Sequence, residues 1–386
     1  MTTATRESNY TETQSVLYLA LELSARRWRL GTAVNLGQRA RQVTIPAGDR
    51  KALEKELAKA KKRFGLDRGA AVCSCYEAGR DAHWVHRFLQ QMQIENLQVN
   101  SSSIEVKRQA RRAKSDSLDV ESLLRLLIRR HMGEHEAFKA VNVPSPQAED
   151  ERHLHRHLSD LKREATRLSN RVRGLLATQG ACLRGPVGEL PEALEGMRSG
   201  DGRPLDRFLK ARLMGLFNLW EAVQQQIAEL ASLRRRWLRE EASESMSRIK
   251  RMMQIKAVGP ELSWTLEMEI FSWRRIRNGK QLGSLLGLTP SPYQSGGSSY
   301  EQGISKAGNR WVRKIIVEVA WMWVRYQPQS ELSRWFERRF AHAGKRARKV
   351  GIVAVARKLA ILLWRFRETG ELPPGVLLKG QAPAAA

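Results

Sequence analysis

The chain has 386 residues, enough for two or three domains, and its 42% hydrophobic content is ordinary for a protein that buries real cores. Lys and Arg number 67 against 40 Asp and Glu, which gives a formal net charge of +27. This charge predicts a polyanionic partner, most commonly nucleic acid, with an anionic membrane surface as the competitor. No apolar run approaches the ~18 residues of a membrane span, the first fifteen residues lack a signal-peptide core, and three cysteines are too few for a disulfide framework. We therefore expect a cytoplasmic protein with no membrane partner.

Residues 1–145 are expected to form a mixed α/β domain. Strands are predicted at 16–24, 28–34, 40–46, 70–77 and 95–100, because each is a short apolar or alternating run. Helices are predicted in the charged segment after residue 48, in 79–92 and in 117–131. The two prolines of "VNVPSPQ" mark the end of this domain.

Residues 146–250 have the heptad pattern of a coiled-coil arm. One seam of apolar residues comprises Leu154, Leu158, Leu161, Ala165, Leu168, Val172 and Leu175. After a Gly/Pro-rich break, a second seam comprises Leu216, Trp220, Val223, Ile227, Leu230 and Trp237. The two long helices form either an internal hairpin or a dimerisation arm, and we favour the arm. Three histidines, His153, His155 and His157, lie in the first segment without matched metal ligands, so we interpret them as part of a solvated face.

Residues 251–375 are expected to form a mainly helical, strongly basic domain. It opens with "IKAVGPELSWTLEMEI", which predicts a tight turn between two helices similar to a helix-hairpin-helix. Such turns present backbone N–H groups to DNA phosphates. Residues 376–386 are expected to be a disordered tail.

Four carboxylates of the first domain are candidate metal ligands. Glu22 lies in the middle of an apolar strand, where an unpaired charge is costly, and Glu77 ends the fourth strand. Asp116 and Asp119 start a helix and project from one face of it. If these groups converge, a divalent ion must neutralise them, and hard oxygen ligands suit Mg²⁺ or Mn²⁺. Ordinary helix-capping roles for the aspartates, and an exposed turn position for Glu77, are the alternatives.

The segment 285–321 contains a candidate nucleophile, Ser295. Two glycines follow it, so a backbone can approach closely. Lys306, Arg310 and Arg313 precede or open an apolar helix, whose N-terminal end favours phosphate. A serine there can attack a phosphodiester while the basic groups stabilise the developing charge. The alternative is a flexible Gly/Ser loop that only contacts DNA.

The order of these motifs resembles the DEDD transposases of bacterial insertion sequences, relatives of the Piv-type DNA invertases that include bridge-RNA-guided recombinases. The family's first strand reads like "GIDVSK", and "ALELS" places Glu22 at its acidic position. Its "YEATG" is similar to "CYEAG" with Glu77, and its "KTDxxDA" to residues 114–120 with Asp116 and Asp119. Its "GLxPxxxxSG…ISKxGNxxLR" matches residues 287–313 and points to Ser295 rather than its neighbouring serines. The resemblance covers residues 16–368, with two departures: Glu22 where most members have Asp, and "KAVGP" for "PGIGP".

The resemblance implies an architecture and a chemistry. It implies a RuvC-like, ribonuclease H-like domain over 1–145, a coiled-coil arm over 146–250 and a serine-containing transposase domain over 251–375. The four carboxylates would hold Mg²⁺, or Mn²⁺, and Ser295 would attack a DNA phosphate to give a covalent phosphoserine. Lys306, Asn309, Arg310 and Arg313 would bind nucleic acid. The implied partners are donor and target DNA, a noncoding guide RNA, and further copies of the chain as a dimer or a synaptic tetramer, nucleoid-associated when active.

Two other functions fit the same residues. A RuvC-like, metal-dependent junction nuclease would use water in place of Ser295, and Ser295→Ala would leave its cleavage intact. A non-catalytic nucleic-acid-binding scaffold would be indifferent to Asp116→Asn.

Overall fold

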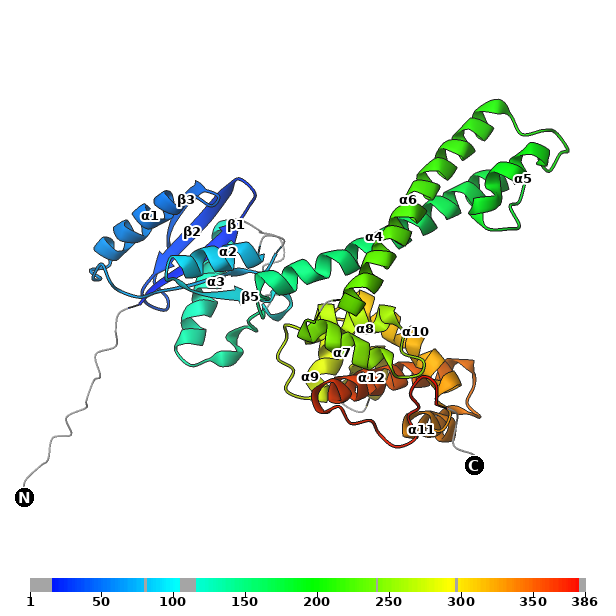
Figure 1. Ribbon diagram of the computed structural model, residues 1–386. Coiled ribbons are helices and arrows are strands. Elements are labelled where there is room, and N and C mark those ends of the chain that lie inside the picture. The colour runs from blue at the N-terminus through cyan, green and yellow to red at the C-terminus, as the bar shows by residue number, and fades with distance from the viewer. Residues whose placement is uncertain (1–15, 80–81, 105–115, 241, 296–297, 382–386) are drawn as a thin grey trace, which may run out of the picture. The chain divides into compact units, whose positions relative to one another are not determined.

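The computed structural model describes residues 16–79, 82–104, 116–240, 242–295 and 298–381, and they divide into two compact units, the first ending at Pro144 and the second beginning at Ser145. The first unit is mixed α/β, as predicted (Figure 1). Its elements are β1 (Leu17–Leu23), β2 (Arg27–Ala33), β3 (Arg41–Pro46), α1 (Arg50–Arg63), β4 (Val72–Glu77), α2 (Ala82–Gln91), β5 (Glu95–Val99), a 3₁₀ turn (Ser101–Ser103), α3 (Asp116–His131) and a second 3₁₀ turn (His135–Ala137).

The five strands of the first unit form one sheet in the order β3-β2-β1-β4-β5. Strands β1, β2 and β3 are antiparallel neighbours, whereas β4 is parallel to both β1 and β5. Helices α1 and α2 bury their apolar residues on one face, and α3 covers the other with Val120, Leu123 and Leu127. Both faces of β1 are therefore buried, which explains its continuous apolar sequence.

The second unit is mainly helical, and its described residues include a small hairpin. Its elements are α4 (Pro146–Ala177), a 3₁₀ turn (Val187–Glu189), α5 (Leu190–Gly196), α6 (Arg207–Glu240), α7 (Glu244–Met253), α8 (Pro260–Leu266), a π-helical turn (Glu267–Phe271), α9 (Gly279–Leu285), β6 (Pro290–Ser295), β7 (Ser298–Ile304), α10 (Arg310–Tyr326), α11 (Glu331–Phe340) and α12 (Lys345–Thr369). No described helix is both long enough and apolar enough to cross a membrane.

The two long helices, α4 and α6, pack against each other within the chain (Figure 1). The internal hairpin that we set against a dimerisation arm is thus present. The seam of α4 is largely buried, as with Leu158, Leu168 and Val172, whereas Val223, Ile227 and Leu230 of α6 are only half-buried. A role of this pair in dimerisation stays a prediction.

Ion pairs connect the α4–α6 pair to α8 and to the π-helical turn that follows it. Arg156 of α4 donates from Nε and Nη2 to the two carboxylate oxygens of Glu269, at 2.7 and 2.8 Å, and Glu269 is buried. Glu261 accepts from both Lys162 of α4 and Arg234 of α6, at 2.7 and 2.9 Å. Since a buried carboxylate is tolerated only when it is paired, these contacts fix the base of the helix pair on the helical body.

The interpretation of the three histidines as a solvated face is wrong for His155. His153 and His157 are exposed, but His155 is 1% exposed and stacks on the ring of Trp311 in α10, with 4.2 Å between ring centroids. Its two ring nitrogens have no hydrogen-bond partner among the described residues. Burial lowers the pKa of His155 to about 4, so the ring is neutral at pH 7.

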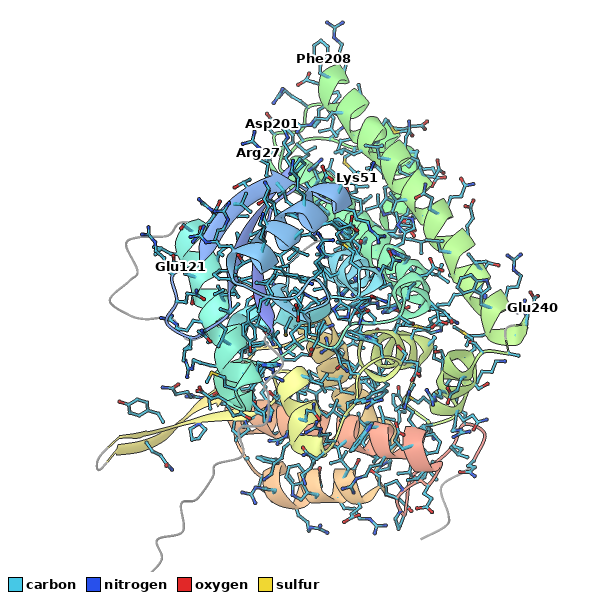
Figure 2. The ribbon with its side chains drawn as sticks, turned by 90° about the vertical axis from the view of Figure 1, so that its left-hand side faces the viewer. Arg27, Lys51, Glu121, Asp201, Phe208 and Glu240 are labelled. Carbon is cyan, nitrogen blue, oxygen red and sulfur yellow. The ribbon has the colours of Figure 1, made fainter. Side chains whose placement is uncertain are left out.

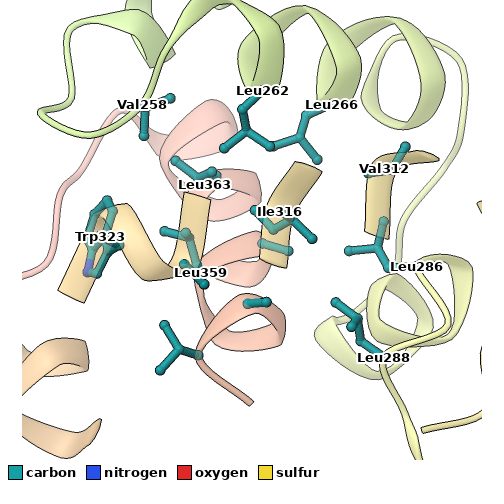
Figure 3. Close-up of a cluster of buried hydrophobic side chains, with 14 of the residues drawn as sticks. Val258, Leu262, Leu266, Leu286, Leu288, Val312, Ile316, Trp323, Leu359 and Leu363 are labelled. Atoms are coloured by element: carbon teal, nitrogen blue, oxygen red, sulfur yellow. The ribbon is translucent and has the colours of Figure 1, made fainter. Parts of the chain in front are cut away.

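The helices after residue 244 share one apolar core, part of which is drawn in Figure 3. Side chains of α8, α10 and α12 meet there, among them Leu262, Ile316 and Leu359. The turn predicted within "IKAVGPELSW" is present between α7 and α8, and Ala257 in it has a positive φ of 74°.

The prediction of a disordered tail over 376–386 is wrong for residues 376–381. The backbone of this segment pairs with the α7–α8 turn, since the N–H of Lys256 donates to the carbonyl of Leu377 and the N–H of Lys379 to that of Gln254. The buried side chain of Gln327 donates to the carbonyl of Leu377 and accepts from its N–H. These partners are distant in sequence, so no local pattern near the end of the chain indicated them. Residues 382–386 lie outside the described residues.

Candidate active site

Two of the four predicted carboxylates lie side by side on the sheet. Strands β1 and β4 are parallel, with Leu21 opposite Tyr76, so Glu22 and Glu77 occupy the next position of each strand. Side chains alternate along a strand, and Ala20 and Cys75, two residues earlier, both pack under α3. Glu22 and Glu77 therefore share the α3 face, at the carboxyl ends of two adjacent strands. Glu22 is half-buried and Glu77 is exposed.

A basic residue that the sequence analysis missed lies opposite Glu22. Arg29 of β2 is its Cα partner in the antiparallel register, and opposite charges at such positions attract across the strands. The Nε of Arg29 is buried and has no hydrogen-bond partner among the described residues. The sequence alone could have indicated this pair, because Glu22 and Arg29 are equally far from the turn that joins the two strands, and such residues face each other in a hairpin. Arg29 thus places a positive charge on the carboxylate face.

The two aspartates are carried by the first turn of α3, as predicted. Val120, which follows Asp119, is fully buried against Gly31 of β2. A Cβ added to Gly31 would lie 2.2 Å from the Cγ1 of Val120, so only glycine allows the helix to approach so closely. Gln42 of β3 donates to the carbonyl of Ser117 at 3.1 Å and fixes the start of the helix over the sheet. Asp116 is exposed and Asp119 is half-buried, while Lys114 and Ser115 of the same motif lie outside the described residues.

The carboxylates suit a divalent ion by donor type but are not gathered around one position. Within the described ranges, no three His, Cys, Asp or Glu side chains lie close enough together to hold a metal ion. Carboxylate oxygens are nevertheless the ligands that Mg²⁺ and Mn²⁺ prefer. Glu22 and Glu77 are neighbours across two paired strands, so an ion at this face could take one carboxylate from each strand.

Three other nucleophilic side chains of β4, two on this face and Tyr76 on the opposite one, are buried and protonated. Burial raises the pKa of the Cys73 thiol to about 12, and it raises the pKa of Cys75 as well. Burial also raises the pKa of the Tyr76 hydroxyl. Because a thiolate or phenolate is the reactive form, none of these three groups is a candidate nucleophile at neutral pH.

The candidate serine ends the first strand of the hairpin in the second unit. Ser295 is the last residue of β6, and its Cα is paired with that of Ser298, the first residue of β7. Gly296 and Gly297, which the sequence analysis singled out, lie outside the described residues. Figure 2 shows the two strands, in yellow, extending away from the helices of their unit. The segment is therefore a hairpin, rather than an irregular loop, with the backbone of Ser295 at its far end.

The base of the hairpin is tied to the start of α10 by backbone hydrogen bonds. Ser305 donates from its N–H to the carbonyl of Thr289 at 2.8 Å, and Asn309 to that of Leu285 at 3.1 Å. Glycines permit this contact: both Gly287 and Gly308 have positive φ, and a Cβ at Gly308 would lie 2.3 Å from the carbonyl oxygen of Leu285. The motif "ISKAGN" thus forms the support of the hairpin.

The four predicted nucleic-acid-binding residues lie in two different settings. Lys306, whose φ is +55°, and Arg310 are exposed on the surface beside the hairpin base. Asn309 caps α10, because its side-chain oxygen accepts from the N–H groups of Trp311 and Val312. Arg313 donates to the carbonyl of Leu286 at 3.1 Å. Lys306 and Arg310 are therefore free to reach a phosphate, whereas Asn309 and Arg313 hold the support in place.

Comparison with known proteins identifies the class to which these two units belong. Residues 249–333, a range that includes the hairpin and its support, match the family described as Transposase IS116/IS110/IS902 family. The chain is similar to the putative transposase y4rJ of Sinorhizobium fredii, with 33% identity over 380 residues that cover 94% of each chain.

More distant relatives are also described as transposases. A probable family 20 transposase of Pseudomonas aeruginosa is 29% identical over 262 residues, covering 66% of this chain and 73% of the relative. The transposase for insertion sequence element IS1111A of Coxiella burnetii is 25% identical over 299 residues, covering 76% of each. The chain therefore belongs to the IS110/IS116/IS902 family of insertion-sequence transposases.

Proposed function

We propose that this transposase is a site-specific DNA recombinase that uses carboxylates of its first unit and a serine of its second. The observation that carries the proposal is the placement of Glu22 and Glu77 on adjacent strands of one sheet face, beneath the helix that carries Asp116 and Asp119. We assign the first unit to the RuvC-like, ribonuclease H-like class on the same grounds. The substrate is DNA of an insertion sequence and of its target.

Ser295 is the proposed nucleophile. Its Oγ forms a bond to the phosphorus of a DNA phosphodiester as the bond from phosphorus to the leaving DNA oxygen breaks. The proton of the serine hydroxyl is lost, and the leaving oxygen gains a proton to become a DNA hydroxyl. A hydroxyl of the partner strand then attacks the phosphoserine and releases the serine. One phosphodiester is exchanged for another, so no external energy source is needed.

The carboxylates would hold Mg²⁺ at the target phosphate. Glu22, Glu77, Asp116 and Asp119 are the proposed ligands, and the ion, when bound, supplies positive charge that stabilises the phosphorane-like transition state. Arg29 would balance the charge of Glu22 and restrain that side chain. Lys306 and Arg310, exposed beside the hairpin base, would bind the DNA backbone at the opposite end of the hairpin from Ser295.

The two sets of proposed catalytic residues belong to separate units, and assembly brings them together in the proposed mechanism. Half-buried apolar residues along α6 support an oligomer formed through the helix pair, as does Phe208 (Figure 2), which is 74% exposed at the start of α6. We propose a dimer that forms a tetramer in synapsis. A net charge of +27 supports the further proposal that a noncoding guide RNA binds together with the two DNAs in the bacterial cytoplasm.

A strand-exchange assay on donor and target DNA separates this function from its two rivals. Ser295→Ala should abolish exchange and cleavage, while a nuclease that uses water would continue to cleave. Ser291→Ala, a substitution at the other serine of β6, is the matched control and should retain exchange. Asp119→Asn should remove activity without loss of DNA binding, and unchanged activity in that variant would rule out the carboxylate site.

A further inference from the structure

The segment around the turn between α11 and α12 is strongly basic and contains no acidic residue. No Asp or Glu lies between Glu337 and Glu368. Six of its basic side chains are exposed near the turn, and none has an ion-pair partner among the described residues. We call them the basic turn surface: Arg338, Arg339, Lys345, Arg346, Arg348 and Lys349.

The core beneath this surface holds the two helices in a fixed crossing. Gly351 of α12 lies against the aromatic rings of α11, and a Cβ there would be 2.7 Å from Phe340 and 2.9 Å from Phe336. Lys358 lies over the ring of Trp335, 4.8 Å from its centroid. The residues before Gly351 thus project from a rigid base, so their charges are held in a defined arrangement.

Fold stability does not account for these charges. Four cations occupy the first turns of α12, where the positive end of the helix dipole disfavours them. Lys345 also lies three and four residues from Arg348 and Lys349, and like charges at those spacings repel on a helix surface. A counter-charge from outside the chain would remove both penalties.

The form of the turn indicates which kind of nucleic acid would supply the counter-charge. A shallow hollow of about 560 Å³ lies at the turn, lined by Phe340, Gly344, Lys345, Arg346, Ala347 and Val350. Phe340, whose ring lines this hollow, is half-buried and packs against Trp335 and Phe336, so it does not offer the row of open aromatic platforms on which single-stranded nucleic acids stack their bases. An exposed helix start fits the major groove of B-form DNA, whereas that of A-form RNA is too narrow.

We propose that the basic turn surface binds the phosphate backbone of duplex DNA, with the start of α12 at the major groove. This surface includes none of the residues proposed for catalysis. It would position the duplex for the reaction, and it would act through counter-ion release.

Duplex binding by the full-length protein tests this inference. We would measure fluorescence anisotropy of a labelled DNA duplex in EDTA, over a range of salt concentrations, with the variant Lys345→Gln/Arg346→Gln/Arg348→Gln/Lys349→Gln. The matched control removes four exposed cations from α1, on the face of the first unit opposite α3: Lys51→Gln/Lys55→Gln/Lys62→Gln/Arg63→Gln.

The proposal predicts that the α12 variant binds duplex about 100-fold or more weakly near 0.1 M salt, and that its slope of log affinity against log salt falls by about 0.9 for each phosphate that the variant no longer neutralises. The α1 control should keep the parent slope, and the thermal midpoint of the α12 variant should be no lower than that of the parent. Unchanged binding by the α12 variant, or an equal loss in the control, would overturn the proposal. The proposal would also be overturned if the α12 variant lost binding to an RNA hairpin but kept its binding to duplex DNA. Because no cleavage occurs in EDTA, failure of this test would leave the serine chemistry untouched.

Discussion

The contact between Gly31 and Val120 controls how closely α3 approaches the sheet, and Gly31→Ala perturbs it directly. The new Cβ would lie 2.2 Å from the Cγ1 of Val120, a fully buried side chain with no room to withdraw. Overpacking of this kind costs about 1–3 kcal/mol. For a unit of this size, that corresponds to a fall of about 3–9 °C in the thermal midpoint. Differential scanning calorimetry of the full chain would record it as a shift of one transition.

A second substitution makes the reasoning refutable. The Cβ of an alanine at 31 would be 3.7 Å from the Cβ of Val120, an ordinary contact distance. The double variant Gly31→Ala/Val120→Ala should therefore be no less stable than Val120→Ala alone. Strand exchange should fall in Gly31→Ala, because α3 carries Asp116 and Asp119, and recover in part in the double variant. An unchanged midpoint in Gly31→Ala, or strictly additive losses in the pair, would contradict this account of the helix position.

Three further predictions concern a buried ring, a helix cap and a proposed ligand. His155, with a folded pKa of about 4, binds a proton near pH 6.5 only when unfolded, so stability should fall by up to about 3 kcal/mol as the pH decreases from 6.5 to 4. In denaturant titrations, the free energy of unfolding of His155→Phe should depend less on pH. An equally steep pH dependence in the variant would contradict this prediction. Asn309→Ala should cost about 1 kcal/mol through the lost cap of α10, whereas Asn309→Asp should retain stability; equal losses would exclude the cap. Glu22→Gln should reduce cleavage by about 10²-fold or more while Glu22→Asp keeps part of it, and a fully active Gln variant would make the residue structural.

Local patterns in the sequence predicted the elements of the first unit well. Each strand was recognisable as a short apolar or alternating run, and the helix 117–131 was recognisable by its spacing, because periodicity depends only on nearby residues. The parallel pairing of β1 and β4 had to be assumed, since register between distant strands is set by packing. The observed register of β1 and β4 makes Glu22 and Glu77 neighbours. Arg29 could have been found by counting outward from the β1–β2 turn.

Long-range contacts explain what the sequence did not reveal. The sequence places His155 in a charged helix as a surface position, yet it is buried and stacks on Trp311, more than 150 residues later. The segment 376–381 is short, close to the end of the chain and without a periodic pattern, and the side chain of Gln327 holds it by two hydrogen bonds. Arg313 reads as a phosphate ligand, yet it donates to the carbonyl of Leu286. In each case the partner is supplied by another part of the fold, which no local pattern records.

The covalent link between the protein and DNA is the most direct test of the proposed function. We would trap the reaction of the full-length protein with its donor and target DNA in Mg²⁺, digest it with nuclease and protease, and identify the modified peptide by mass spectrometry. The account predicts a nucleotide linked through phosphate to Ser295, absent from Ser295→Ala and present in Ser291→Ala. DNA strand exchange without any such adduct, or an adduct on a different side chain, would contradict it.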